Sequence, residues 1–355
     1  MSPYIKKIGI AVALTALGAL VPGARADDPL PPATVQDCLA CHGDPDLSIT
    51  LGSGETQSLH VEAGAYAHSV HGSALNCTAC HPGFEAQPHP AVNTASRATF
   101  RAAFRDACRT CHLDNDRKAH DGVHYQLLAA GDTRAPFCAD CHTAHAIAPP
   151  ARPRAHISQM CGQCHAPIVA AYRESVHGRA LTDGNPDVPA CTDCHRAHDM
   201  KDPRQRAWLL ETPQMCGKCH SDRKLAAKYG MSDKVLQTYL ADFHGMTASL
   251  HERKNTGSTR FTALCIDCHG VHDIKRVKDP HSRVVRDNLV KTCQACHAGA
   301  GPTFPAAWLS HYEPSPKKAP LVYAVKVFYV AFIPFVIGGL VLQVGLNLWR
   351  FWVGR

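Results

Sequence analysis

Two long apolar runs lie at opposite ends of this 355-residue chain, and the segment between them is mostly polar. The first run extends from Ile8 to Val21, after Lys6 and Lys7, and is followed by Ala24-Arg25-Ala26. A basic start, a short apolar run and a small-x-small tripeptide are typical of a secretory signal. Residues 1–26 are therefore expected to be a signal peptide that is cut after Ala26. An uncleaved anchor is the alternative, but the run is shorter than the roughly 20 residues that a span needs.

The second apolar run extends from Leu321 to Trp349 and is interrupted by only three polar residues. It is long enough to cross a bilayer as one helix. Arg350 and Arg355 follow it, and with an exported N-terminus they predict that the short C-terminal tail faces the cytoplasm. We expect residues 321–349 to form a transmembrane helix; the alternative is a buried helix in a soluble core.

The segment between the two runs is predicted to form short helices separated by irregular loops. Ile168 to His177 and Ser232 to Phe243 look like short helices. Pro, Gly and Asp gather in Ala148 to Pro153 and in Thr182 to Pro189, which favours loops there. The expected fold is mostly α-helical, with extensive irregular loops and little or no β-sheet.

The composition does not fit an ordinary globular core. The chain has 18 Cys and 24 His, while aromatic residues make up only 7% of it. Large side chains cannot be the main filling of the interior, so another bulky apolar group is expected to supply it.

All 18 cysteines fall into C-x-x-C pairs, and each pair is followed at once by a histidine. In chain order the nine motifs contain Cys38, Cys41 and His42 (motif 1); Cys77, Cys80 and His81 (2); Cys108, Cys111 and His112 (3); Cys138, Cys141 and His142 (4); Cys161, Cys164 and His165 (5); Cys191, Cys194 and His195 (6); Cys216, Cys219 and His220 (7); Cys265, Cys268 and His269 (8); Cys293, Cys296 and His297 (9).

C-x-x-C-H is the attachment signature of c-type haem, in which two thiols bind one haem covalently and the histidine binds its iron. Disulfides and zinc sites also use paired cysteines. Neither requires histidine at the next position nine times out of nine. The sequence therefore predicts about nine covalently attached haems c, which would lie close together and form the core.

The formal charge of +7 gives no support to nucleic-acid binding. Three of the cations lie in the predicted signal peptide, and each ferric haem with two ionised propionates adds about −1. The mature protein is therefore expected to be acidic.

The motifs are arranged as an internal repeat. The pattern from Cys108 to His145 recurs 53 residues later from Cys161 to His198. Variable copies are visible elsewhere, which gives a nonahaem domain over residues 27–315. Its predicted parts are two-haem units at about 38–89, 108–145, 161–198 and 216–272, and a single haem at 293–297.

The repeat selects histidines that could bind the second axial position of each iron. Four lie inside the units and three follow a motif histidine by three residues. The first unit has Phe84 at that last position, so His89 is the substitute there, and His311 is the candidate for the last haem. The predicted distal ligands are His71, His124, His177, His244, His145, His198, His272, His89 and His311.

Six histidines remain, and they are expected to be solvated or to form hydrogen bonds. His60, His68 and His120 would be the replacements if one of the nine distal ligands is wrong; the others are His156, His251 and His281. Ligation by two histidines would give lower potentials than ligation by histidine and methionine.

The segments SVHG (175–178), CTDCH (191–195), DFHG (242–245) and CIDCHGVHD (265–273) resemble the doubled-C-x-x-C-H multihaem cytochromes of bacterial respiratory chains. The resemblance covers about Cys38 to His311. It implies a mostly irregular, helix-containing haem stack that carries electrons on the periplasmic side of the inner membrane. It also implies exchange with the quinone pool, often through a membrane b-type cytochrome.

The expected function is electron transfer between a quinone-linked membrane partner and periplasmic redox proteins, with no catalytic residue. One alternative is a multihaem oxidoreductase with a substrate-binding haem for hydroxylamine, nitrite or a sulfur oxyanion. The C-x-x-C-K motif of nitrite reductases does not occur. The other is a direct quinol dehydrogenase that uses the haem at 293–297. The tetrahaem quinol dehydrogenases carry an N-terminal membrane anchor, whereas the anchor predicted here is C-terminal.

Overall fold

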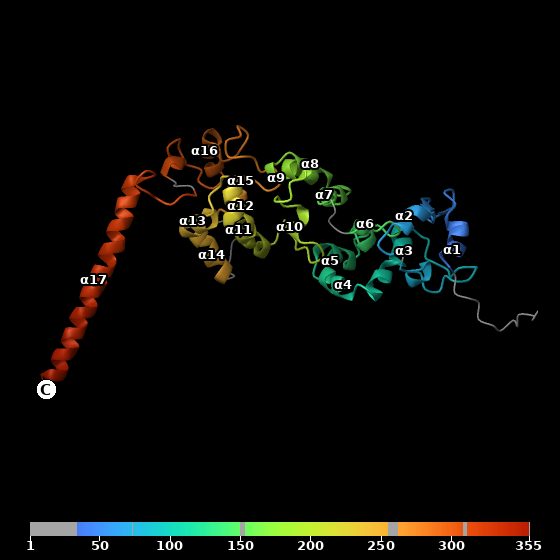
Figure 1. The fold of residues 1–355 in the computed structure, drawn as a ribbon, viewed down its shortest axis with the longest axis horizontal. Helices are drawn as coiled ribbons and strands as arrows, with labels where there is room; N and C mark the ends of the chain where they lie inside the picture. The colour runs from blue at the N-terminus through green and yellow to red at the C-terminus, as the bar shows by residue number, and fades with distance from the viewer. Residues whose placement is uncertain (1–33, 73, 150–152, 255–261, 308–310, 355) are drawn as a thin grey trace, which may run out of the picture.

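The computed structural model describes residues 34–72, 74–149, 153–254, 262–307 and 311–354. These residues form an elongated series of short helices, which runs from α1 at one end to α17 at the other (Figure 1). The predicted signal peptide lies outside the described residues.

The α-helices are α1 (Val35–His42), α2 (Ala63–Ala67), α3 (Arg97–Ala102), α4 (Leu113–His120), α5 (Val123–Ala129), α6 (Cys138–His142), α7 (Ala155–Gly162), α8 (Ala166–Arg173), α9 (Val176–Thr182), α10 (Cys191–His195), α11 (Arg206–His220), α12 (Arg223–Lys228), α13 (Val235–Ala241), α14 (Phe243–Lys254), α15 (Cys265–His269), α16 (Arg286–Gln294) and α17 (Pro320–Val353). Three short 3₁₀ helices are η1 (Cys77–Ala79), η2 (Arg105–Thr110) and η3 (Phe304–Ala307).

The described residues contain one small sheet, in which β1 (Ser48–Thr50) pairs with β2 (Thr56–Ser58) in antiparallel register. The prediction of a mostly helical fold with little β-sheet is therefore confirmed.

Each of the two predicted helices is divided in the structure. The segment from Ile168 to His177 breaks at Ser175, whose hydroxyl accepts a hydrogen bond from the Gly178 amide (2.9 Å) and caps α9. The segment from Ser232 to Phe243 breaks at Asp242, which accepts from the Gly245 amide in the same way (3.0 Å). The helix boundaries were wrong because the capping residues favour a new start over continuation.

Three of the motifs form five-residue helices that cap themselves. Motifs 4, 6 and 8 read C-x-D-C-H, and their Asp140, Asp193 and Asp267 accept a hydrogen bond from the backbone amide just before the helix. This closes the first turn, where amides otherwise have no partner. The aspartate inside the motif therefore fixes the turn that presents both cysteines and the histidine.

The residue after each of these three helices has a positive φ. Gly270 has φ +84°, Thr143 has φ +62° and Arg196 has φ +63°. Glycine adopts this conformation readily, whereas a residue with a side chain is strained by roughly 1–3 kcal/mol.

Replacing Thr143 with Gly is therefore expected to stabilise the protein by about 1 kcal/mol, after the larger entropy of glycine in the unfolded chain is subtracted. The denaturant midpoint should rise while the haem content stays unchanged. Thr143→Ala is the control because it keeps the Cβ; an equal rise for Ala would contradict the strain argument.

The buried polypeptide core is small. One cluster joins Ile157, Leu181 and Ala190, and another joins Tyr239, Ala248 and Leu264. Such clusters are too small to support a chain of this length on their own. This favours the expectation that cofactors complete the interior.

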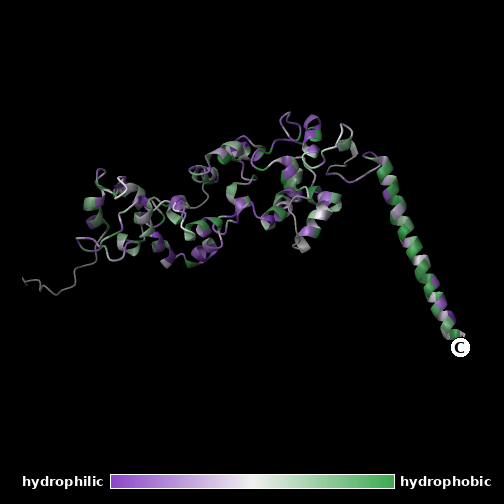
Figure 2. Ribbon diagram, turned by 180° about the vertical axis from the view of Figure 1, so that it is seen from behind, coloured by the Kyte–Doolittle hydropathy of each residue, from purple (hydrophilic) through white to green (hydrophobic). Residues whose placement is uncertain are grey.

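Helix α17 stands apart from the other helices and is apolar along its length (Figures 1 and 2). Its 34 residues suffice to cross a membrane, and none of the residues in its most apolar window is buried. It begins and ends slightly outside the predicted 321–349. The alternative of a helix buried in a soluble core does not fit this exposure.

Candidate haem-binding sites

Some of the predicted axial histidines lie at helix ends, with motif histidines at C-terminal ends and distal histidines at N-terminal ends. Motif histidines such as His42 and His220 are the last residues of α1 and α11. His124, His177 and His244 are the second residues of α5, α9 and α14. The side chains of a C-terminal turn and an N-terminal turn can thus face each other across a gap.

Among the described residues, nine histidine pairs join one motif histidine to one predicted distal histidine. Their ring centroids lie 5.9–6.2 Å apart. In the order of the motifs the pairs are His42–His89, His81–His145, His112–His71, His142–His198, His165–His124, His195–His272, His220–His177, His269–His311 and His297–His244.

This separation fits two imidazoles on opposite sides of one metal ion. A nitrogen–metal bond of about 2.0 Å and about 1.1 Å from that nitrogen to the ring centroid give roughly 6.2 Å between the two rings. A direct hydrogen bond of about 2.9 Å between the rings would bring their centroids to about 5 Å. The residues present therefore fit haem iron with two histidine ligands.

The rings of the first pair are oriented by their own backbone contacts. Nδ1 of His42 donates to the carbonyl of Leu59 (2.8 Å), and Nδ1 of His89 donates to the carbonyl of Ala86 (3.0 Å). These bonds fix the tautomer of each ring and leave Nε2 free to bind a metal. His89, the substitute for the missing histidine at Phe84, is thus prepared for ligation.

Burial keeps several of these histidines neutral. Together with a smaller effect of the neighbouring His220, it lowers the pKa of His177 to about 4. Burial also lowers the pKa of His220 and His269. Neutral imidazole is the form that binds metals, so these rings need not lose a proton near pH 7 before ligation.

The sulfur atoms show which motifs are neighbours. Hydrogen bonds join the first cysteines of motifs 1 and 2, 3 and 4, 5 and 6, and 7 and 8, namely Cys38–Cys77, Cys108–Cys138, Cys161–Cys191 and Cys216–Cys265. The hydrogen bond from Cys161 lowers the pKa of the Cys191 thiol to about 6. Once both sulfurs are thioethers, neither titrates.

Electrostatic contacts then link each pair of motifs to the next. They join Cys80 with Cys111, Cys141 with Cys164, Cys194 with Cys216 and Cys268 with Cys293. Motifs that are consecutive in the sequence are therefore also neighbours in space.

The remaining histidines lie outside the nine pairs. His68 donates to the carbonyl of Gly64 (2.7 Å), and His120 lies 3.6 Å from the Asp116 carboxylate. His156 is 3.1 Å from the Gln159 side-chain oxygen. These contacts agree with the hydrogen-bonding role expected for these three histidines. The expectation is wrong for Nδ1 of His60 and Nδ1 of His251, which are buried without a hydrogen-bond partner in the described structure.

A close approach of the backbone, at tyrosines that the sequence did not single out, explains why glycine follows three of the four distal histidines that lie inside the units. A Cβ on Gly178 would lie 1.9 Å from the Tyr172 carbonyl oxygen, so only glycine fits there. Gly72 and Gly245 meet Tyr66 and Tyr239 in the same way. The signal was present as a tyrosine six residues before each of these glycines.

A comparison with protein families gives one match. Residues 131–221, which include motifs 4 to 7, match the family model described as cytochrome c3. This segment is therefore similar to multihaem c-type cytochromes. The match supports covalently bound haem c and a role in electron transfer. No curated protein and no solved structure matches the chain.

The matched segment agrees with the family resemblance found in the sequence. Its four motifs span the end of the predicted second unit, the whole third unit and the start of the fourth. The haem count and the ligand assignment remain predictions along the whole chain.

Proposed function

We propose that the protein is a membrane-anchored electron-transfer cytochrome with nine haems c, each held by two histidines. It would pass electrons between a quinone-linked membrane partner, such as a b-type cytochrome, and periplasmic redox proteins. Haem iron supplies the one-electron couple, and the chain fixes the position, ligation and order of the irons.

The observation that carries this proposal is the set of nine histidine pairs. Each motif histidine of the described chain has one distal partner at 5.9–6.2 Å. A substrate-binding iron needs an open or exchangeable position, and complete pairing favours six-coordinate irons instead. Bis-histidine electron transfer is therefore preferred over the oxidoreductase alternative.

The neighbour contacts support transfer along the whole chain. Hydrogen bonds and electrostatic interactions between cysteines connect motif 1 to motif 2 and so on to motif 9, without a skipped motif. Redox centres held in this order would form a single file. Motif 1 would be its outer end and motif 9 the end next to α17.

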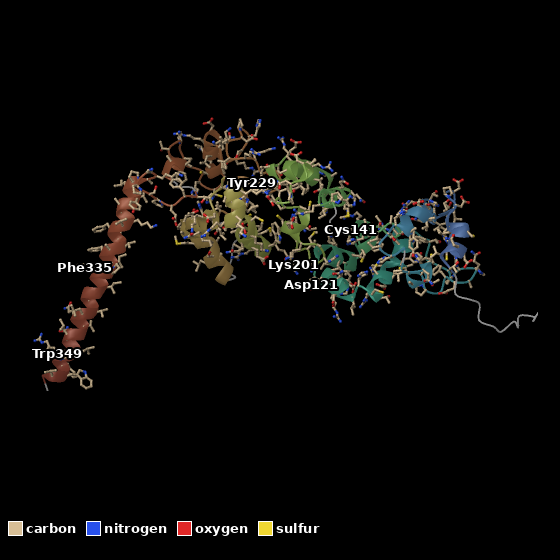
Figure 3. All side chains as sticks on the ribbon, viewed as in Figure 1. Asp121, Cys141, Lys201, Tyr229, Phe335 and Trp349 are labelled. Carbon is tan, nitrogen blue, oxygen red and sulfur yellow. The ribbon has the colours of Figure 1, made fainter. Side chains whose placement is uncertain are left out.

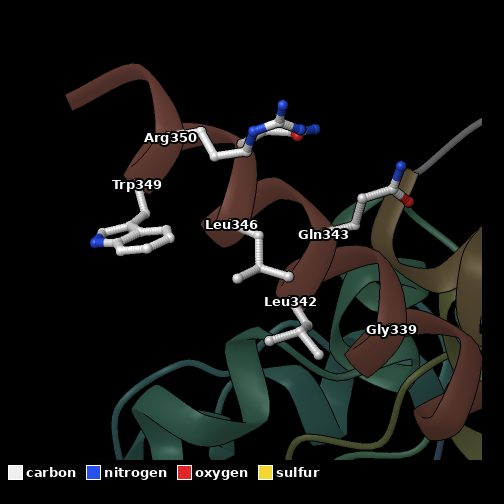
Figure 4. Close-up of a pocket in the computed structure, with 7 residues that line it drawn as sticks. Gly339, Leu342, Gln343, Leu346, Trp349 and Arg350 are labelled. Atoms are coloured by element: carbon white, nitrogen blue, oxygen red, sulfur yellow. The ribbon is translucent and has the colours of Figure 1, made fainter. Parts of the chain in front are cut away.

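Helix α17 supports both the anchor and a membrane partner. One hollow on this helix is lined by Gly339 and the polar residues Gln343, Asn347 and Arg350, together with Leu342, Leu346 and Trp349. Gln343 and Arg350 lie along the same side of the helix (Figure 4). The hollow is formed by one helix alone and is not a ligand pocket. Small and polar residues on one side of a membrane helix favour contact with another helix, since lipid cannot satisfy the amides.

The segment that holds motifs 1 and 2, at the outer end of the single file, differs from the rest of the chain in its charged residues. Residues 34–96, which hold motifs 1 and 2, contain no Lys or Arg. Their six carboxylates are all exposed: Asp37, Asp44, Asp46, Glu55, Glu62 and Glu85. A periplasmic partner with a cationic surface would be attracted to this end.

The proposal is tested by the haem content and spin state of the purified full-length protein. Intact mass and pyridine haemochrome absorbance are expected to give nine covalent haems per chain. EPR and absorption spectra should show low-spin iron throughout. Far fewer haems would contradict the attachment sites, and a high-spin iron that binds cyanide or nitrite at once would favour the oxidoreductase alternative.

A further inference from the structure

We infer that consecutive two-haem units exchange axial ligands, so that each boundary is crossed by two histidines in opposite directions. This inference rests on the proposed bis-histidine ligation. It assigns each distal histidine to a particular iron, which for most of them belongs to a neighbouring unit.

The first boundary, between units 38–89 and 108–145, illustrates the exchange. His71 belongs to the first unit, but its ring lies 6.0 Å from His112, the motif histidine of the second unit. His145 belongs to the second unit and lies 6.1 Å from His81 of the first. Each unit thus gives one ligand and receives one.

The same exchange recurs at the next two boundaries. The internal histidine of each unit pairs with the first motif of the following unit, as in His124–His165 and His177–His220. The histidine three residues after a unit's second motif pairs with the second motif of the preceding unit, as in His198–His142 and His272–His195.

The irons that do not follow this exchange belong to the two ends of the series of units, where no neighbouring unit is present to supply a ligand. The first unit has no preceding unit to serve, and it has Phe84 where the other units have a histidine. Motif 1 also receives no ligand from a preceding unit, and His89 pairs with His42 instead. At the other end motif 9 receives His244, but no complete unit follows to serve motif 8, and His311 takes that place.

A repeated backbone contact holds each exchanging boundary together. Two histidines cross each boundary: one lies inside the earlier unit, and one follows the second motif of the later unit. The backbone amide just before the first of these histidines donates a hydrogen bond to the backbone carbonyl two residues after the second. The three bonds are Val70 to Ile147 (2.9 Å), Val123 to Met200 (2.7 Å) and Val176 to Ile274 (2.8 Å).

A lysine reinforces the second and third boundaries. Lys201 donates to the carbonyl of Asp121 (3.2 Å; Figure 3), and Lys275 donates to that of Glu174 (2.6 Å). The lysines and their carbonyls occupy equivalent positions in the two repeats. The contacts that bring the crossing histidines together are therefore as periodic as the histidines themselves.

Pairs of substitutions in the full-length protein distinguish exchange from ligation within a unit. His145→Ala alone should make one iron high-spin. The double variant His81→Ala with His145→Ala should still have one high-spin iron, because both substitutions remove ligands from the same iron. The double variant His142→Ala with His145→Ala should have two high-spin irons, because two irons each lose one ligand.

The mirror experiment tests the opposite direction. The double variant His71→Ala with His112→Ala should have one high-spin iron, because both residues belong to one pair. The double variant His71→Ala with His81→Ala should have two high-spin irons. The spin count comes from EPR and from cyanide binding, intact mass should show nine haems in every variant, and His156→Ala is the control that changes nothing. The two directions share only His81→Ala, so misfolding caused by any other substitution leaves the opposite direction as a complete test.

The outcomes separate the two proposals. The reversed counts, two with His81→Ala and one with His142→Ala, would overturn the exchange but preserve bis-histidine ligation. No high-spin iron in His145→Ala or in His71→Ala would instead overturn the ligand assignment in the proposed function.

Discussion

His177→Ala is expected to convert one of the nine irons from low spin to high spin. The His177 ring lies 6.2 Å from the His220 ring of motif 7, the separation that a shared iron requires. Alanine cannot bind the metal, so this iron would keep one histidine and gain an open position. Cyanide should bind there, and about one-ninth of the low-spin EPR intensity should be lost.

The substitution leaves the cysteines of motif 7 untouched, so the protein should still carry nine haems. His156→Ala is the matched control, since His156 is an exposed histidine outside the nine pairs. Unchanged low-spin spectra in His177→Ala would show that His177 is not an axial ligand. Loss of a whole haem would indicate instead that the ring is needed for attachment.

Ending the chain at Ala319 is expected to move the protein from the membrane fraction to the soluble periplasmic fraction with its haems intact. The deletion removes α17, whose apolar residues are exposed in the described structure and would be covered only by lipid or by another membrane protein. About 20 apolar residues bind a bilayer in an effectively irreversible way. Cell fractionation followed by haem staining measures the change.

The paired substitution Gln343→Leu with Asn347→Leu separates anchoring from partner binding. It keeps α17 apolar and should leave the protein in the membrane, while co-purification with the quinone-linked partner is reduced. A truncated chain that still sediments with membranes would show that the haem domain has its own membrane contact. Normal co-purification of the leucine variant would argue against the polar side of α17 as the partner surface.

Short-range sequence patterns identified the C-x-x-C-H motifs but predicted wrong boundaries for two helices, and the structure explains this difference. A C-x-x-C-H motif is complete within five residues, and the aspartate that caps three of them lies inside the motif. The break at Ser175 depends on a hydroxyl that accepts from an amide three residues ahead. A helical pattern extends over Ser175 without interruption, so the cap was visible only in the folded backbone.

The chain's own sequence predicted the attachment chemistry, because two thiols and a histidine at fixed spacing meet a local requirement of one cofactor. It also selected seven distal histidines through their repeat positions, left His89 and His311 as candidates for the remaining two irons, and marked an apolar segment long enough to span a bilayer. The C-x-x-C-H motifs carry this information regardless of how the units pack.

Only the tertiary structure decided which distal histidine faces which motif. His145 lies three residues after His142, yet its ring is 6.1 Å from His81, in another unit. Sequence proximity cannot predict this, because the turn at Thr143 directs the chain away from its own motif and the contact of Val70 with Ile147 joins it to the preceding unit. A ligand pair depends on where two backbones meet in space, and that is set by packing between units.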